Sequence, residues 1–424
     1  MAAGSVAAPD LSTINQQVTQ AFGKFPLVSG DTTRGVTANS INIAVEGDFT
    51  IGGAPEFTDV CQGVQARVNL ANASHELPQK INIVGCDDAG GDPNRATSLL
   101  QTDVLQKHIF AAIYMPVAPP AANILAQYHV PYFGWGINAD YCGNQPYAFS
   151  DTGAVVCTIV QQTTGKNVEE PGIFTAVIKA AGLTPATARV AAFAENTSNG
   201  KDDVENTVGD LNAAGVKPVF AQAFVPPPTS GGTPNYSPEV AAVLATKPNI
   251  ITSDLTAATL AAFTQALRQA GYTGMIQQAV FVDSSVFGYG QLATAVNGTY
   301  GVGETGSPAF GGSAWTQITA AAKGVGVTAP GGLGFIHAYA STDLMITAIK
   351  AFEATGKPLT AENLTNFINA GWTYPGIGNV IAPEQFPLAH YINNPCTDLV
   401  KIDATSKQIL PVADLSCGPA ILGG

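Results

Sequence analysis

One pattern recurs along this chain and constrains its fold more than any other feature: a short apolar run, a polar loop, then a helical stretch. It is clearest at residues 81–100. Residues 81–84 form a β-branched run typical of a buried parallel strand, and the polar pair Asp87-Asp88 follows it. Asp92 suits a helix N-cap and Pro93 suits the first helical position. In open α/β sheets, ligands bind beyond the carboxyl ends of strands, so these polar loops are the expected binding region.

The same unit repeats in two runs separated by a polar, turn-rich stretch at residues 140–157. We predict an α/β fold of two doubly wound parallel-sheet lobes. The expected strands are residues 40–45, 81–84, 109–114, 130–133, 189–194, 218–224, 250–252 and 279–282, with a hairpin at 400–402 and 409–412. The expected helices are residues 57–72, 93–100, 121–128, 172–181, 202–214, 238–245, 258–270, 335–355 and 360–369. Residues 140–157 and 298–304 are predicted to cross between the lobes, and residues 1–35 to form an N-terminal extension.

Composition excludes several classes of function. The chain has 424 residues, a net charge of −13 and only 18 Lys and Arg. No basic run is present, so a nucleic-acid partner is not expected. Charged residues make up 12% of the chain, about half of the ~25% usual for globular proteins, which favours a secreted protein. No apolar stretch approaches the ~20 residues of a membrane span. No signal peptide is present, and an export signal is expected to have been removed.

Six cysteines are present, with no C-x-x-C spacing among them: Cys61, Cys86, Cys142, Cys157, Cys396 and Cys417. An even number in a chain of this composition suggests disulfides, with free buried thiols as the alternative. Spacing does not fix the connectivity. The predicted hairpin would, however, bring Cys396 and Cys417 opposite each other.

The sequence gives little support for an enzyme. The five histidines are scattered, and HExxH, GxSxG and P-loop motifs are missing. Asp87 and Asp88 resemble an acid/base pair, but capping and loop hydrogen bonds explain them better. We expect no catalytic residue, cofactor or metal, although a constellation assembled from distant loops stays open.

Several segments together resemble one family. Residues 41–49 resemble its opening strand and ligand loop, 85–93 its "DD…DP" segment, and 130–136 its "VP" strand. Residues 198–201 resemble its "YGKG" loop, and residues 236–248, 281–284, 339–350 and 359–370 resemble later landmarks. The family is the type I periplasmic binding proteins, specifically the leucine/isoleucine/valine-type substrate-binding proteins of ABC transporters. The resemblance spans roughly residues 41–412.

This resemblance implies two lobes joined by three crossings, with a ligand held in the cleft between them by hinge closure. Lobe 1 would be residues 36–150 and 303–372, and lobe 2 residues 151–302 and 373–424. Some of these receptors join the first helix to the second strand by a disulfide, which implies Cys61–Cys86, and then Cys142–Cys157 and Cys396–Cys417. The implied partners are a small-molecule ligand and transporter permease subunits. The implied location is extracytoplasmic, as a monomer, with membrane contact only through a lipid anchor.

The implied ligand-binding residues follow the predicted strands. In lobe 1 they are Phe49, Thr50, Pro116, Val117, Ala118, Trp135, Gly136 and Asn138, and in lobe 2 they are Asn199, Thr256 and Asp283. Three have structural alternatives: hinge-side packing for Trp135, a helix N-cap for Asp283, and the lobe core for Phe49.

One loop departs from the family pattern. Amino-acid receptors of this type hold the ligand carboxylate with hydroxyls and backbone N–H groups in the first lobe. Here residues 115–120 read Met-Pro-Val-Ala-Pro-Pro, without a hydroxyl and with three prolines that lack an N–H. Asn138 falls near the family's Thr, and Asp283 falls at its acidic position. We therefore expect a receptor for a small apolar or aromatic ligand. The alternatives are a receptor for branched-chain or other amino acids, and a ligand-sensing ectodomain of a signalling receptor.

Overall fold

The computed structural model describes residues 6–50, 57, 59–116, 121–143, 145–227, 235–279 and 281–423, without the side chains of Ser198, Asn199 and Tyr289. The chain divides into two compact units. Unit 1 comprises Met1–Ala8, Asn15–Thr163 and Gly312–Asn394, and unit 2 comprises Pro9–Ile14, Thr164–Gly311 and Pro395–Gly424. After the short segment Pro9–Ile14, the chain changes unit three times, following Thr163, Gly311 and Asn394.

These boundaries differ from the expected ones in three places. Residues 140–157 are not a crossing, because strand β5 (Ala148–Ser150) pairs with β4 (Tyr132–Gly134) inside unit 1. Residues 298–304 are not a crossing either, because β11 (Tyr300–Gly303) lies within the sheet of unit 2. Residues 373–394 belong to unit 1 rather than to the second lobe, since the Tyr374 hydroxyl donates to Asp343 Oδ2 at 2.7 Å.

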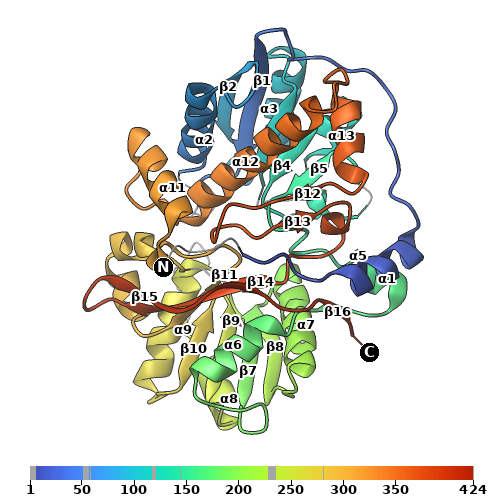
Figure 1. Ribbon diagram of the computed structural model, residues 1–424. Helices are drawn as coiled ribbons and strands as arrows, with labels where there is room; N and C mark the ends of the chain where they lie inside the picture. The colour runs from blue at the N-terminus through green and yellow to red at the C-terminus, as the bar shows by residue number, and fades with distance from the viewer. Residues whose placement is uncertain are drawn as a thin grey trace. The chain divides into compact units, whose positions relative to one another are not determined.

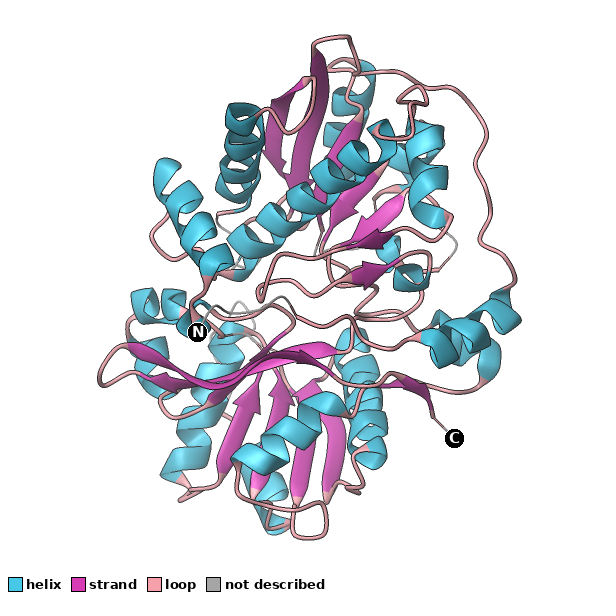
Figure 2. Cartoon of the chain, in the orientation of Figure 1, coloured by secondary structure: helices cyan, strands magenta, loops and turns pink. Residues whose placement is uncertain are grey.

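The sheet of unit 1 is wholly parallel, in the order β2-β1-β3-β4-β5 (Figure 2). The outer strand is β2 (Lys80–Asp88), followed by β1 (Ser40–Gly47) and β3 (Ala111–Met115). Ile41, Ile43 and Val45 of β1 face one apolar core, whereas Ala44 faces another. Both faces of the sheet are therefore covered, as is typical of parallel sheets.

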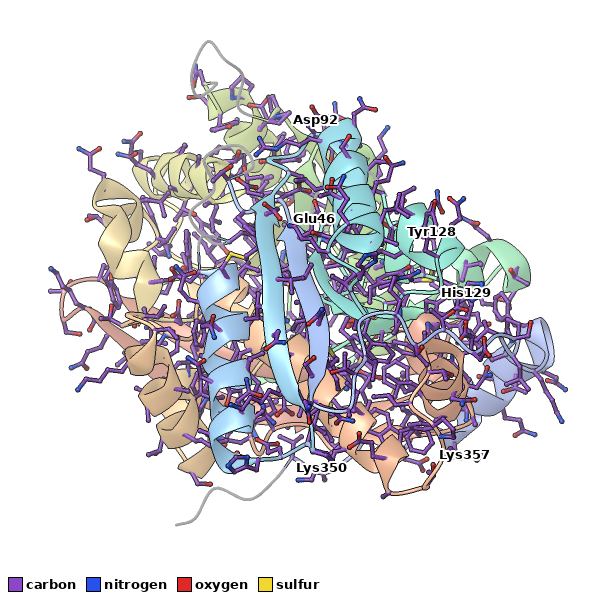
Figure 3. The ribbon with its side chains drawn as sticks, turned by 90° about the horizontal axis from the view of Figure 1, so that it is seen from above. Glu46, Asp92, Tyr128, His129, Lys350 and Lys357 are labelled. Atoms are coloured by element: carbon purple, nitrogen blue, oxygen red, sulfur yellow. A yellow bond between two sulfur atoms is a disulfide. The ribbon has the colours of Figure 1, made fainter. Side chains whose placement is uncertain are left out.

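Helices of unit 1 cover these two faces. The first core is shared by α2 (Val60–Ser74), α11 (Ser313–Gly324), α12 (Leu333–Glu353) and α13 (Ala361–Asn369), and Figure 1 shows α12 crossing its sheet. The second core includes α3 (Pro93–Leu105) and α4 (Asn123–Gln127). The predicted cap of α3 is confirmed, because Asp92 accepts hydrogen bonds from the N–H groups of Asn94 and Arg95 (Figure 3). The sequence did not predict α11.

The sheet of unit 2 has the order β15-β14-β11-β10-β9-β7-β8. Its five parallel strands are β7 (Val190–Glu195), β8 (Phe220–Val225), β9 (Ile250–Asp254), β10 (Met275–Gln278) and β11. The predicted hairpin is confirmed as the antiparallel pair β14 (Cys396–Asp403) and β15 (Gln408–Cys417). The helices of this unit include α6 (Gly172–Ala180), α7 (Ser198–Ala213), α8 (Ser237–Ala245), α9 (Ala257–Gln269) and α10 (Gln291–Ala295).

The strand predicted at residues 279–282 is wrong, because β10 occupies Met275–Gln278. Two buried glutamines conceal this strand in the sequence. The Gln278 amide donates to the Phe281 carbonyl at 2.8 Å and accepts from the Phe281 N–H at 2.7 Å, and Gln277 accepts from the Thr252 hydroxyl. Paired amides are tolerated in a sheet interior, where unpaired amides are not.

The remaining elements are short. They are α1 (Ser12–Phe22), η3 (Ala139–Tyr141), α5 (Ile159–Thr164), η4 (Ser284–Tyr289), η5 (Pro308–Phe310), η6 (Leu388–His390), and the strand pairs β12 (Thr373–Tyr374) with β13 (Glu384–Gln385) and β6 (Val168–Glu169) with β16 (Ile421–Leu422). Among the described helices, none is long and apolar enough to span a bilayer.

All six cysteines are in disulfides: Cys61–Cys86, Cys142–Cys157 and Cys396–Cys417. The first joins α2 to β2, the second lies after β4 in unit 1, and the third closes the open end of the β14–β15 hairpin. In the chain-entropy model, a bridge like Cys61–Cys86 stabilises the fold by about 3 kcal/mol.

One carboxylate helps to fasten the segment before β1 to the rest of unit 1. Glu362 of α13 accepts hydrogen bonds from the Thr32 N–H at 2.8 Å and the Thr32 hydroxyl at 2.7 Å. His129, labelled in Figure 3, lies 2.5 Å from the same carboxylate. Burial raises the pKa of Glu362, but the hydrogen bonds from His129 and Thr32 outweigh burial and leave the pKa below its usual value.

We predict that Glu362→Gln lowers the free energy of unfolding at pH 7 by about 1–3 kcal/mol, because it weakens charge-assisted hydrogen bonds. A depressed pKa stabilises the fold above the unfolded value of about 4.3, and that stabilisation disappears as the pH falls through the folded value. Urea unfolding at pH 7 and at pH 3 should therefore show a difference between the variant and the parent that shrinks in acid. Glu353→Gln is the matched control, since the side-chain carboxylate of Glu353 makes no hydrogen bond to the described residues. Equal effects of the two substitutions would contradict the assignment.

Candidate functional site

The loops after β1 and β2 in unit 1 are tied together by two aspartates. Asp88 Oδ1 accepts from the N–H of Phe49 at 2.8 Å and of Gly90 at 2.9 Å, and its Oδ2 accepts from the Thr50 hydroxyl. Asp48 Oδ1 accepts from the Gly91 N–H at 2.7 Å. Burial raises the pKa of Asp88, but the hydrogen bonds from Thr50, Gly90 and Phe49 lower it overall. Asp88 is thus a loop-bonding residue, as expected.

Phe49 and Thr50 were both expected to bind ligand. Phe49 is only 7% exposed and packs in the apolar core of unit 1. This is the position that the alternative interpretation, packing in the lobe core, predicts. The Thr50 side chain is exposed, but its hydroxyl is engaged by Asp88. Pro116 directly follows β3, whereas Val117 and Ala118 lie outside the described residues.

Trp135 directly follows β4 and forms a half-buried aromatic platform. Its indole stacks on the imidazole of His337 with ring centroids 4.1 Å apart and planes 7° from parallel. The Phe57 ring lies 6.1 Å away at a tilt. Glycine is required on both sides, because a Cβ at Gly134 would collide with the Tyr114 carbonyl and one at Gly136 with the Gly153 carbonyl. The backbone therefore fixes where this indole can lie.

Behind Trp135 lies a buried His–Asp pair that the sequence did not suggest. His337 Nδ1 of α12 is 2.9 Å from Asp151 Oδ2, and both side chains are at most 1% exposed. Burial raises the pKa of Asp151, and the nearby imidazole opposes the rise. His337 lies among apolar residues of a helix, and from the sequence alone such a residue is expected simply to pack in the core. Its hydrogen bond to Asp151, far away in sequence, shows that it also has a polar partner.

Asn138 and Asp140 organise the loops after β3 and β4. Asn138 Oδ1 accepts from the Asp140 N–H at 3.0 Å and so caps η3. Asp140 Oδ2 accepts from the Tyr114 hydroxyl at 3.0 Å and from the N–H groups of Ala121 at 3.0 Å and Ala122 at 3.1 Å. Burial raises the pKa of Asp140, and these hydrogen bonds oppose the rise. Asp140 was not predicted, because no local pattern marks a carboxylate that binds a loop 18 residues away.

Glu46 is a second buried carboxyl that the sequence did not single out. It is labelled in Figure 3, is 1% exposed and lies on β1, one residue before the strand ends. In the sheet it is paired with Asp87 of β2 and Tyr114 of β3. Neither oxygen has a hydrogen-bond partner among the described residues. Burial, together with the charge of Asp48, raises its pKa to about 8. Burial therefore favours the neutral form of Glu46.

In unit 2, the loops after β7 and β9 are joined by Glu195. Its Oε1 accepts from the Thr256 hydroxyl at 2.7 Å and from the Thr256 N–H at 3.2 Å. Thr256 therefore orders this loop whether or not it binds ligand. Asp254 ends β9. Burial raises the pKa of Asp203 on α7, and the nearby charge of Asp254 raises it further. Asn199 lies in the first turn of α7, but its side chain is outside the described residues.

Asp283 lies in the loop after β10 and is the N-cap of η4. Its Oδ1 accepts from the Ser285 N–H at 3.2 Å and from the Ser285 hydroxyl at 2.5 Å. This oxygen therefore caps η4, as the alternative interpretation of Asp283 predicts. Oδ2 has no hydrogen-bond partner among the described residues, although the side chain is only 3% exposed. Burial raises the pKa of Asp283 to about 6. One oxygen therefore remains for a further donor.

A competing surface site lies at the amino ends of the strands of unit 2. A cavity of about 740 Å³ there is lined by Arg268, Tyr272, Tyr300 and Lys401 among others. Arg268 already donates to the carbonyls of Tyr272 at 2.8 Å and Gly274 at 3.2 Å. The Arg268 guanidinium is therefore already hydrogen-bonded to the backbone. The described residues contain no cluster of three His, Cys, Asp or Glu suited to a metal.

Comparisons with known proteins give one consistent result. A family model described as "Periplasmic binding protein" matches residues 40–407. No match was found among curated protein sequences.

Similar solved structures share the fold at low sequence identity. A possible leucine/isoleucine/valine-binding protein from Rhodopirellula baltica is 14% identical, with TM-score 0.67, over 89% of this chain and 97% of its own. A fatty acid ABC transporter substrate-binding protein from Thermomonospora curvata is 17% identical, with TM-score 0.67, over 91% of this chain and 95% of its own. A solute-binding protein of an R. palustris ABC transporter in complex with 4-hydroxybenzoate is 15% identical, with TM-score 0.64, over 90% of this chain and 98% of its own. All three support the type I periplasmic binding protein fold.

We predict that His337→Leu lowers the free energy of unfolding by about 1–3 kcal/mol, because it leaves the buried Asp151 carboxyl group without its hydrogen-bond partner. Adding Asp151→Leu should recover part of this loss, since two apolar residues can replace a buried pair at little cost. Urea denaturation of the parent, both single variants and the double variant gives the coupling energy. Additive losses would show that the pair does not act as a unit.

Proposed function

This chain belongs to the periplasmic binding protein family, and we propose that it is the solute-binding receptor of an ABC importer for a small apolar or aromatic ligand. Members of this family are solute receptors rather than enzymes, and they work outside the cytoplasm. Three disulfides fit that location. The observation that carries the ligand class is the Trp135 platform, with Phe57 beside it and His337 behind it.

In this proposal, strand-end loops of both units contact the ligand. Unit 1 contributes Trp135 with Gly136, the Phe49-Thr50 loop and the segment from Pro116 through Val117 and Ala118. Unit 2 contributes Thr256, Asp283 and the Asn199 turn. The three passages of the chain between the units would act as hinges, and ligand would favour the closed form by touching both units. Aromatic and apolar surface with few polar groups is typical of small-molecule sites.

Solved structures of this fold offer precedents for such ligands, including the 4-hydroxybenzoate complex and the fatty acid receptor. A receptor for branched-chain or other amino acids is the second candidate. The unpartnered oxygen of Asp283 favours it, because an ammonium group could donate to that oxygen. A sensing ectodomain, a monomeric state and a lipid anchor stay predictions.

We predict that a thermal-shift screen of aromatic and aliphatic acids, alcohols, amines and branched-chain amino acids identifies a stabilising compound. A ligand at 100 times its dissociation constant adds about 2.7 kcal/mol of stability. Trp135→Leu should weaken binding of that compound about 10-fold or more. Trp372→Leu is the matched control, because its indole packs on Phe386 and Phe367 within unit 1. Equal affinity of the Trp135→Leu variant and the parent would remove the platform from the site.

A further inference from the structure

Glu46 lies in a buried row of polar side chains on one face of the unit 1 sheet. Ala44 of β1 faces the core that includes α3 and α4, and side chains alternate along a strand, so Glu46 faces the same core. Its partner on β3, Tyr114, belongs to that core. Its partner on β2, Asp87, bonds to Lys107 at the end of α3. The three paired residues therefore share one face.

Two side-chain donors on this face already bond to other carboxyl groups. Lys107 Nζ lies 3.0 Å from Asp87 Oδ2, and the Tyr114 hydroxyl donates to Asp140 Oδ2 at 3.0 Å. Neither oxygen of Glu46 has a hydrogen-bond partner among the described residues, although Glu46 is only 1% exposed. An ionised Glu46 would therefore have little contact with solvent and no protein donor to stabilise its charge.

The charged groups around Glu46 are mostly acidic. The titratable groups near it on this face are Asp48 after β1, Asp87 of β2, Tyr114 of β3, Tyr132 of β4, Asp103 of α3, Lys107 after α3, and Asp140 and Tyr141 of η3. Lys107 is the one cation of this set, and it is shared between Asp87 and Asp103. A proton on Glu46 therefore removes repulsion from several neighbouring carboxylates.

Hydrogen bonds between two strand-end loops lie next to this row. Two residues after Glu46, Asp48 accepts the Gly91 N–H at 2.7 Å. Asp88, the last residue of β2, accepts the Phe49 N–H at 2.8 Å. Both bonds join the loop after β1 to the loop after β2. A negative charge on Glu46 would repel β2 and α3 directly beside these bonds.

We propose that Glu46 is a proton-binding switch within unit 1, which holds the loops after β1 and β2 together while it carries a proton and loosens them when it ionises. This switch requires no ligand. If the Phe49-Thr50 loop contacts the ligand, a consequence that rests on the proposed function, ligand affinity would fall as Glu46 ionises.

The pH range of the switch follows from the burial of Glu46. Burial, together with the charge of Asp48, raises its pKa to about 8. The unfolded chain would have a pKa of about 4.3 at this residue. A carboxyl group whose pKa is raised in the folded protein destabilises the fold as the pH rises from the unfolded value to the folded value, and adds nothing beyond it.

Urea unfolding of the parent and of Glu46→Gln between pH 5 and pH 9 tests the proposal, because glutamine keeps the size of the side chain but cannot ionise. The variant should become more stable relative to the parent as the pH rises. The ratio of the two unfolding equilibrium constants should change by about 10-fold per pH unit and level off above about pH 8. Glu353→Gln, at the end of α12, is the matched control and should not show this trend. A constant ratio for Glu46→Gln overturns the proposal.

Hydrogen–deuterium exchange locates the effect. The two proteins are compared at the same pH, so that the intrinsic exchange rate is equal in both. At pH 9, peptides covering residues 44–50 and 85–92 should exchange faster in the parent than in Glu46→Gln, and the difference should shrink at pH 6. Equal exchange of these peptides at pH 9 overturns the coupling of Glu46 to the loops.

Asp103→Asn supplies the test if Glu46→Gln does not fold. It removes from α3 one of the charges that raise the pKa of Glu46. At pH 9 its strand-end loops should therefore exchange more slowly than those of the parent. Equal or faster exchange overturns the proposal. Neither variant is measured with a ligand, so failure here leaves the proposed receptor function intact.

Discussion

Backbone N–H groups in the turns that end buried strands must find acceptors, and here the protein's own carboxylates supply many of them. Leaving such a donor unpaired is unfavourable by about 1–3 kcal/mol. Asp88 bonds the loop after β1 while belonging to β2, and Asp140 bonds the loop after β3 while following β4. Asp398 of β14 does the same for the segment after β11. Each carboxylate therefore bonds the end of one strand, or its loop, to a neighbouring strand or its loop.

Much of the fold follows from local patterns in the sequence. The Asp92-Pro93 start of α3 and the β14–β15 hairpin depend on short-range chemistry, and both were predicted. The strand near β10 was misplaced because a local pattern misleads there. Gln277 and Gln278 are polar, which argues against a buried strand, but their amides are paired inside the sheet. Unit boundaries were also misplaced, since they depend on contacts such as that of Tyr374 with Asp343.

The candidate site was less predictable for the same reason. A resemblance to a family places Trp135 and Asp283 after their strands, but it does not say what supports them. His337 and Asp151 are 186 residues apart in sequence, and no periodicity links them. Phe49, expected in a binding loop, is buried in the core, where an aromatic side chain contributes more by packing. Contacts between residues far apart in sequence thus show structural roles that no local pattern reveals.

The strand-end loops of unit 1 combine an aromatic platform with carboxylates that bond the backbone. The glycines flanking Trp135 fix its backbone, and the His337–Asp151 pair supports one face of its indole. Hydroxyl and N–H donors are few in the loop after β3, whereas acidic groups are present after strands of both units. In the proposed function, the aromatic surface is what favours an apolar or aromatic ligand.

The most direct test of the central claim is hydrogen–deuterium exchange with and without a compound that stabilises the protein. If strand-end loops bind the ligand, protection should appear in peptides covering residues 47–50, 135–141, 254–257 and 281–286. Protection confined to the cavity near Arg268 and Lys401, at residues 268–275 and 298–301, would contradict the account and place the ligand at the amino ends of the strands of unit 2.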